Sequence, residues 1–284
     1  MAKKKKSSVL VVVFTLLVLI LLLTKISKKN EAKEDVSNTV TENTSGTQVQ
    51  EHASNAPNLL EIPQLKVSRA EQIIEHKAYT VSYNEDWRIP NWVAYELTRS
   101  EASGNGDRAN RFEADPEVDG ASASYKDYSA SEYDRGHMAP AGDMKWDQTA
   151  MNECFYMSNI CPQNHNLNSG DWNDLEMQIR YWAKKYGNVY ITCGPIVSDH
   201  PETIGTNDVA VPDAFYKVCL CQIDGTWQGI GFVFENKAGH KRLTSYCKSI
   251  DEVEKITGID FFPNLDDNIE NKVEAQFNTN AWKF

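Results

Sequence analysis

In the middle of the chain, where strand-like apolar segments dominate, one segment has clear helical periodicity. Along Ser169–Tyr186 apolar residues recur at spacings of 3, 4 and 3, which places them on one helix face, and Gly187 ends the pattern. The strand-like runs are Tyr79–Tyr83, Trp92–Thr98, Phe155–Ile160, Val189–Cys193, Phe215–Gln222 and Gly229–Phe234. Because these elements do not alternate regularly, the sequence predicts an α+β fold with a mixed or antiparallel central sheet and helices.

Shorter signals predict further elements. Asp224-Gly225 separates two strand-like runs and is typical of a hairpin turn. Ser249–Gly258 begins with a capping box and ends with glycine, as helices do. We expect a short helix at Arg69–His76. Ser100–Asp119 is charged and rich in Gly and Asn, so it is expected to be a long loop, and loops of this length are often functional.

The N-terminus has the layout of an export signal. Lys3–Lys6 precede an apolar run, Val9–Leu23, which only Thr15 interrupts, and three further lysines follow. No A-x-A-like cleavage site follows the run, and its length approaches the lower limit for a spanning helix. The sequence therefore favours an uncleaved signal-anchor over a cleaved signal. The rest of the chain is then expected to be exported and extracytoplasmic, either membrane-anchored or, after cleavage, secreted or periplasmic.

Charge and polarity divide the chain into three parts. Residues 1–30 form the expected signal-anchor or transmembrane segment and hold seven lysines and no acid, whereas residues 31–58 are polar and predict a disordered linker. Residues 59–284 are the expected folded domain. The 254 residues after residue 30 carry 22 basic and 40 acidic side chains, a net charge of −18. This excess argues against a protein that binds nucleic acid mainly through its overall charge.

The segment Asp134-Arg135-Gly136-His137 combines a base with a guanidinium. Histidine titrates near neutral pH, so His137 can accept a proton from water. Arg135 lies on the same face as His137 if the segment is extended, and a guanidinium beside a base suits a substrate that carries phosphate. Gly136 allows a close backbone approach to a ligand or an unusual turn. Taken alone, a single histidine is more often structural.

Asn168 and Glu176 form a second candidate set. Asn168 precedes the amphipathic helix, where its side chain can cap the helix or offer its carbonyl oxygen to a hard cation such as Mg²⁺. Glu176 follows eight residues later and is expected on roughly the same helix face. One neutral oxygen and one carboxylate predict a sparse cation site that keeps several waters, which Mg²⁺ tolerates.

Together these segments resemble the DNA/RNA non-specific endonuclease family, which includes secreted bacterial sugar-non-specific nucleases and mitochondrial endonuclease G. The resemblance covers most of residues 85–240. It rests on Asp134-Arg135-Gly136-His137, Ser158-Asn159-Ile160-Cys161-Pro162-Gln163, Leu167-Asn168, Trp172 and Glu176, in this order. It implies that residues 59–284 are an endonuclease domain with a ββα-metal, or His-Me finger, core. The implied reaction is metal-dependent hydrolysis of DNA and RNA, giving 5′-phosphate and 3′-hydroxyl ends.

The resemblance also implies roles for single residues. His137 is similar to the general base, Arg135 to the phosphate-contacting arginine, Asn168 to the single protein ligand of Mg²⁺, and Glu176 to a carboxylate that holds the cation through water. Mn²⁺ or another divalent cation is an alternative to Mg²⁺. Dimers occur in the family, which makes a homodimer possible here.

A second arginine of the family lies upstream, near a Phe and an Asp. The corresponding segment here runs from Arg108 to Phe112 before Asp115, so either Arg108 or Arg111 fits, and the other is then a solvated loop arginine. Asp134 and Asn159 are expected as supporting hydrogen-bond groups.

Several alternatives stay open at this point. A binding or inhibitory module that kept the fold and lost catalysis, and an envelope phosphodiesterase with a non-nucleic substrate, both fit the same fold. The six cysteines contain no CxxC pair, so a zinc ribbon is not expected, and disulfides and buried thiols are equally compatible with their spacing.

The charge distribution predicts a shallow salt dependence of substrate binding. Arg99–Lys145 holds six basic and ten acidic residues, so few phosphates can be neutralised. The slope of log Kd against log salt, measured by fluorescence anisotropy on duplex DNA, should correspond to fewer than about eight phosphates. A steeper slope contradicts this prediction.

Overall fold

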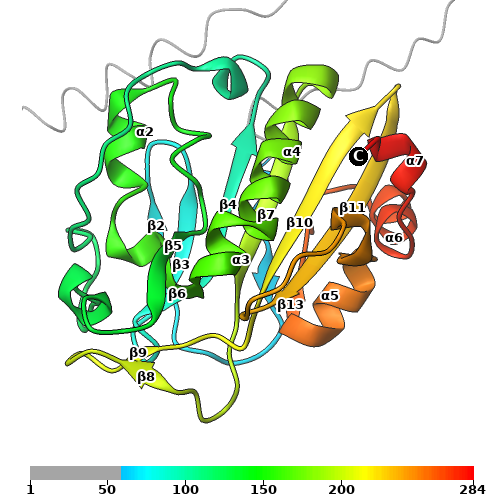
Figure 1. Ribbon diagram of the computed structural model, residues 1–284. Helices are drawn as coiled ribbons and strands as arrows, with labels where there is room; N and C mark the ends of the chain where they lie inside the picture. Colours follow the sequence, from blue (N-terminus) through cyan, green and yellow to red (C-terminus); the bar gives the residue numbers. More distant parts are fainter. Residues whose placement is uncertain (1–58) are drawn as a thin grey trace, which may run out of the picture. The chain divides into compact units, whose positions relative to one another are not determined.

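The computed structural model describes residues 59–284, and its centre is an antiparallel sheet of seven strands (Figure 1). In spatial order the strands are β12 (Cys247–Lys248), β11 (Thr226–Glu235), β10 (Ala214–Ile223), β7 (Val189–Ile196), β4 (Ile89–Leu97), β3 (Thr80–Asn84) and β2 (Gln72–Glu75). Three smaller antiparallel pairs are β1 (Gln64–Leu65) with β13 (Ile259–Asp260), β5 (Tyr133–His137) with β6 (Ile160–Asn164), and β8 (Thr203–Ile204) with β9 (Val209–Ala210). The predicted α+β class with a central antiparallel sheet is confirmed.

Helices cover both faces of the central sheet. They are α2 (Gln148–Glu153), α3 (His165–Ser169), α4 (Asp171–Tyr186), α5 (Ile250–Thr257), α6 (Asp267–Glu274) and α7 (Thr279–Trp282). Residues alternate between the faces along β10: Phe215, Cys219 and Cys221 belong to one buried cluster, and Tyr216, Val218 and Leu220 to another. Helix α4 packs on the first face, across β7 and β10, whereas α5 and α6 contribute to the second cluster (Figure 1).

The β5–β6 hairpin, α3 and α4 form the ββα unit on the first face of the sheet. Asn159, fully buried just before β6, fixes the hairpin to its surroundings. Its Oδ1 accepts a hydrogen bond from Ala139 N at 2.9 Å, and its Nδ2 donates to the backbone oxygens of Ala139 at 2.9 Å and Cys154 at 2.8 Å. The side chain therefore satisfies main-chain groups that would otherwise be buried without partners.

Many local predictions are confirmed. The helix at Ser169–Tyr186 is α4 and ends before Gly187. The hairpin turn has Asp224 and Gly225 at φ 49° and 77°, which fits a type I′ turn. The capping box of Ser249 is present, and Gly258 closes α5 in the left-handed region.

Two predictions are wrong. Arg69–His76 is not a helix: Gln72–Glu75 form the edge strand β2, in which Ile74 is buried and Ile73 exposed, because pairing with β3 imposes a period of two. Phe155–Ile160 is not a strand, since Met157–Asn159 form a 3₁₀ turn and β6 begins at Ile160. At this point the Asn159 side chain makes the hydrogen bonds to the Ala139 main chain that a neighbouring strand would otherwise make.

The predicted signal-anchor (1–30) and polar linker (31–58) lie outside the described residues. Within residues 59–284, no helix has the length and apolar character that a membrane crossing requires.

Asn159→Ala tests the support of the hairpin. It removes three buried hydrogen bonds and should lower the free energy of unfolding by about 2–4 kcal/mol in a urea titration. The exposed Asn152→Ala is the matched control and should change stability by less than about 0.5 kcal/mol. If the two substitutions lower the free energy of unfolding equally, Asn159 does not hold the β5–β6 pair in place.

Candidate active site

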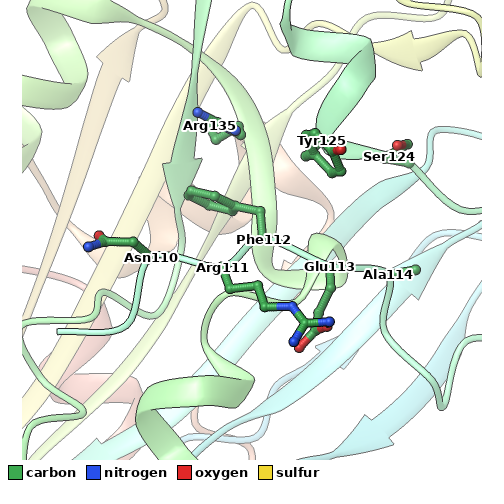
Figure 2. Close-up of a pocket in the computed structure, with 9 residues that line it drawn as sticks. Asn110, Arg111, Phe112, Glu113, Ala114, Ser124, Tyr125 and Arg135 are labelled. Atoms are coloured by element: carbon green, nitrogen blue, oxygen red, sulfur yellow. The ribbon is translucent and has the colours of Figure 1, made fainter.

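Strand β5 presents Arg135 and His137 on the same face, as the extended segment predicts. The guanidinium carbon of Arg135 lies 4.5 Å from the centre of the Phe112 ring, and the His137 ring centre lies 5.4 Å from it. The Phe155 ring packs against His137 at 4.8 Å between centres. Figure 2 shows the Phe112 ring turned toward Arg135. The aromatic rings therefore fix the base beside the guanidinium.

His137 is 9% exposed, and its Nε2 is buried with no hydrogen-bond partner among the described residues. Its backbone oxygen accepts a hydrogen bond from Trp172 Nε1 at 3.3 Å, which joins β5 to α4. Burial, and then the charges of Arg108 and Arg135, lower the pKa of His137 to about 3. The ring is therefore neutral at pH 7 and able to accept a proton.

Packing requires glycine at position 136. A Cβ atom at this position would lie 2.6 Å from Cβ of Gln163 on the paired strand. Any larger residue would push the hairpin strands apart and displace His137.

Asn168 lies within α3 and is oriented by Asp134. Asn168 Nδ2 donates to Asp134 Oδ2 at 2.9 Å, and His165 Nδ1 lies 2.8 Å from the same oxygen. The capping alternative is wrong, because Gly170 is the N-cap of α4 and has no side-chain cap. With its amide nitrogen held by Asp134, Asn168 has its carbonyl oxygen Oδ1 left for a cation.

Glu176 lies on α4, and no single helix joins it to Asn168. The helix predicted from Ser169 begins at Asp171, and Gly170 separates it from α3, which carries Asn168. That Glu176 and Asn168 face the same cation stays a prediction. Burial raises the pKa of Glu176 to about 7, against the lowering effect of the Lys217 ammonium. Arg108 affects the pKa values of both Glu176 and His137, so these two groups lie around the same guanidinium.

Lys217 is a functional candidate that sequence reasoning missed. It is fully buried on β10, where Nζ donates to the backbone oxygen of Met138 at 3.4 Å and lies 4.4 Å from the Trp172 ring centre. Nearby, Asp143 pairs with Arg180 at 2.6 Å and accepts a hydrogen bond from Tyr95 at 2.9 Å. A lysine at an inward position of the apolar run Phe215–Gln222 was the available signal.

The structure separates the two upstream arginines. The Arg108 guanidinium lies 5.1 Å from the Phe155 ring centre and lowers the pKa of His137. Arg111 pairs with Glu113 at 3.2 Å and its side chain is 85% exposed; Figure 2 shows it turned toward Glu113. Arg108 is therefore the better match to the second phosphate-contacting arginine.

A buried carboxylate holds the loop that carries both arginines. Asp115 Oδ2 lies 2.8 Å from His76 Nε2 and accepts a hydrogen bond from Ser158 Oγ at 2.5 Å. The loop is thus fastened to the turn that precedes β6.

Two cavities adjoin at Phe112, Tyr125 and Arg135 (Figure 2). The larger has a volume of about 610 Å³, and the smaller, about 250 Å³, also includes Asp134 and Asn168 in its lining. Aromatic faces next to a guanidinium suit the bases and phosphates of a nucleic-acid strand.

A basic loop lies beside α3. It carries four exposed side chains, Lys237, His240, Lys241 and Arg242. At one end Asn236 Oδ1 accepts a hydrogen bond from Asn164 N at 2.7 Å. At the other end Asp171, the first residue of α4, lies 2.7 Å from His240 Nδ1 and accepts a hydrogen bond from Lys241 N at 3.2 Å.

The six cysteines, all within the described residues, are free thiols. Five of them are buried and Cys247 is half-buried. Of the two alternatives, the structure thus has the buried thiols and no disulfide.

The comparisons with known proteins agree with this geometry. A sequence model described as DNA/RNA non-specific endonuclease matches residues 56–268. A crystal structure of an EndoG/EndoGI complex superposes with a TM-score of 0.67 and 30% identity, covering 76% of this chain and 96% of that one. The fold is that of the EndoG nuclease, and the chain belongs to the DNA/RNA non-specific endonuclease family.

Individual relatives have sequence identities of 32–38% to this chain. The mitochondrial nuclease EXOG of Xenopus laevis is 38% identical over 216 residues, 70% of this chain and 60% of that protein. Nuclease C1 of Cunninghamella echinulata var. echinulata is 37% identical over 215 residues, 69% of this chain and 85% of that protein. The mitochondrial endonuclease G of Homo sapiens is 32% identical over 209 residues. The chain matches 58–62% of the length of the EXOG proteins.

The arginine assignment has a direct test. Arg108→Ala should lower kcat/KM for plasmid cleavage by about 10²–10³-fold, because it removes a charge next to His137 and Glu176. Arg111→Ala is the matched control and should stay within about threefold, because that side chain is exposed and paired with Glu113. The reverse order of effects contradicts the assignment.

Proposed function

We propose that the chain is an endonuclease that requires a divalent metal ion and hydrolyses phosphodiester bonds of DNA and RNA. The observation that carries the proposal is a nearly buried histidine packed against two phenylalanine rings, each of which lies under an arginine: Phe112 under Arg135 and Phe155 under Arg108. Family membership supports the same activity. Among the candidate functions, this one uses the histidine, both arginines, Asn168 and Glu176.

The donors present fit Mg²⁺, and Mn²⁺ is an alternative. Asn168 would be the direct ligand through Oδ1, since Asp134 holds its amide nitrogen. Glu176 would accept hydrogen bonds from water around the cation. When bound, the cation supplies positive charge at a non-bridging phosphate oxygen and at the leaving 3′-oxygen. A site with so few protein ligands suits an ion that keeps several waters.

His137 is the proposed general base. It takes a proton from the attacking water while its ring stays fixed between Phe112 and Phe155. Burial is the main cause of the lowered pKa of His137, and the charges of Arg108 and Arg135 add to it. A bound phosphodiester would offset the contribution of the two arginines.

The arginines hold the phosphate and stabilise the charge that develops on it. Attack by water with departure of the 3′-oxygen leaves a 5′-phosphate on one product and a 3′-hydroxyl on the other. Phosphate contacts carry no sequence information, so the enzyme is expected to have little sequence preference.

The remaining sequence-based proposals concern the chain outside the site. We retain the signal-anchor at 1–30, the linker at 31–58 and the endonuclease domain at 59–284 as proposals. Membrane attachment, an extracytoplasmic location and a homodimer stay predictions. The names of two relatives, EXOG and endonuclease G, describe those proteins as mitochondrial.

His137→Ala tests the mechanism. The variant should fold, and its plasmid-nicking rate in Mg²⁺ should fall by about 10²–10⁴-fold, because the water loses its proton acceptor. His200→Ala, at an exposed position, is the matched control and should keep the native rate. EDTA should abolish nicking by the native enzyme. Cleavage by His137→Ala that persists in EDTA would overturn the proposal.

A further inference from the structure

A cluster of carboxylates joins α5 to α6, in the part of the molecule that forms the second buried cluster. Asp251 and Glu254 belong to α5, and Glu274 is the last residue of α6. One carboxylate oxygen from each of the three lies within 4.8 Å of the others. The helices contribute to the core that contains Val218 and Leu220, whereas His137 packs among residues of the other core.

Glu274 is the unusual member of this cluster. It is 8% exposed, and its Oε1 is buried without a hydrogen-bond partner in the described part of the chain. Burial of an unpartnered polar oxygen is costly and rare, so such a group points to a ligand. Since the side chain is directed at two other carboxylates, that ligand has to be a cation or a proton.

Basic side chains do not neutralise the cluster. Among the ion pairs of residues 59–284, none involves Asp251, Glu254 or Glu274. Two lysines of this region pair with other acids: Lys66 with Asp260 at 2.7 Å, and Lys248 with Glu252 at 3.6 Å. Asp260 and Glu270 add further negative charge nearby.

One member of the cluster is also held in place by the fold. Glu254 Oε1 already accepts a hydrogen bond from Phe261 N at 2.9 Å, which fixes that carboxylate in place.

We propose that Asp251, Glu254 and Glu274 bind one hard divalent cation, Ca²⁺, which ties α6 to α5 at a site separate from the nuclease centre. Ca²⁺ accepts carboxylate and water oxygens in irregular geometry, which suits three acids on two helices. Asp251 and Glu254 lie inside the segment that the family model matches, whereas Glu274 lies beyond its end at residue 268.

Thermal unfolding of the full chain tests the site. After EDTA treatment and dialysis at pH 7.5, CaCl₂ at about 100 times the dissociation constant should raise the Tm by about 5–10 °C. Glu274→Gln should lose this rise, because the substitution removes a charged ligand from the cluster. Calcium titration calorimetry should show one fewer site in this variant.

Two controls separate the site from its surroundings and from the active centre. Glu270→Gln removes a neighbouring acid on α6 that lies outside the cluster, and it should keep the calcium-dependent rise. Asn168→Ala alters the proposed nuclease centre and should keep it too, so the two proposals fail independently. An absent calcium effect, which means that the acids share a proton, overturns the proposal, as does an equal rise in Glu274→Gln.

Discussion

A buried lysine connects the three parts of the molecule that form the nuclease site. Lys217 extends from the central sheet, bonds the backbone that follows β5 at Met138, and lies over Trp172 of α4. An ammonium in a core requires a compensating charge, because an uncompensated buried charge costs several kcal/mol. Glu176 is the nearby carboxylate whose pKa responds to Lys217. Lys217 thus contacts the backbone after β5 and helix α4 from the central sheet, and its charge also acts on the carboxylate proposed to face the cation.

The arrangement explains how an acidic chain can act on a polyanion. Folding brings Arg108 next to the strand of Arg135, although the sequence between them contains more acids than bases. Several of these acids are bonded within the fold: Asp115 to His76 and Ser158, and Asp134 to Asn168. These carboxylates position the site, whereas the two guanidiniums flank His137. Net charge therefore describes solubility and long-range attraction, and local geometry decides what the site can bind.

The sequence predicted the features that short-range physics decides. The period of α4 and the capping box of Ser249 depend on neighbours within a few residues, and both are confirmed. Strand β2 was mistaken for a helix because its pattern is short and its partner β3 imposes the period. Asn168 was placed beside a helix start, but the break at Gly170 depends on packing. Lys217 was missed because its partners are far away in the chain. The motif identified the family, and only the fold distinguished Arg108 from its neighbour.

The two faces of the central sheet solve the same electrostatic problem in different ways. On the nuclease face, side chains supply the positive charge: Lys217 stands near Glu176, and Arg180 pairs with Asp143. In the cluster between α5 and α6, Glu274 lacks such a partner. A covalently attached charge keeps its geometry when the substrate and its cation leave, which a catalytic centre requires between turnovers. The junction between α5 and α6 takes part in no reaction, so a diffusible cation is sufficient to neutralise its carboxylates. The physical requirement is the same in both places, and the difference lies in whether the charge must stay in place when the site empties.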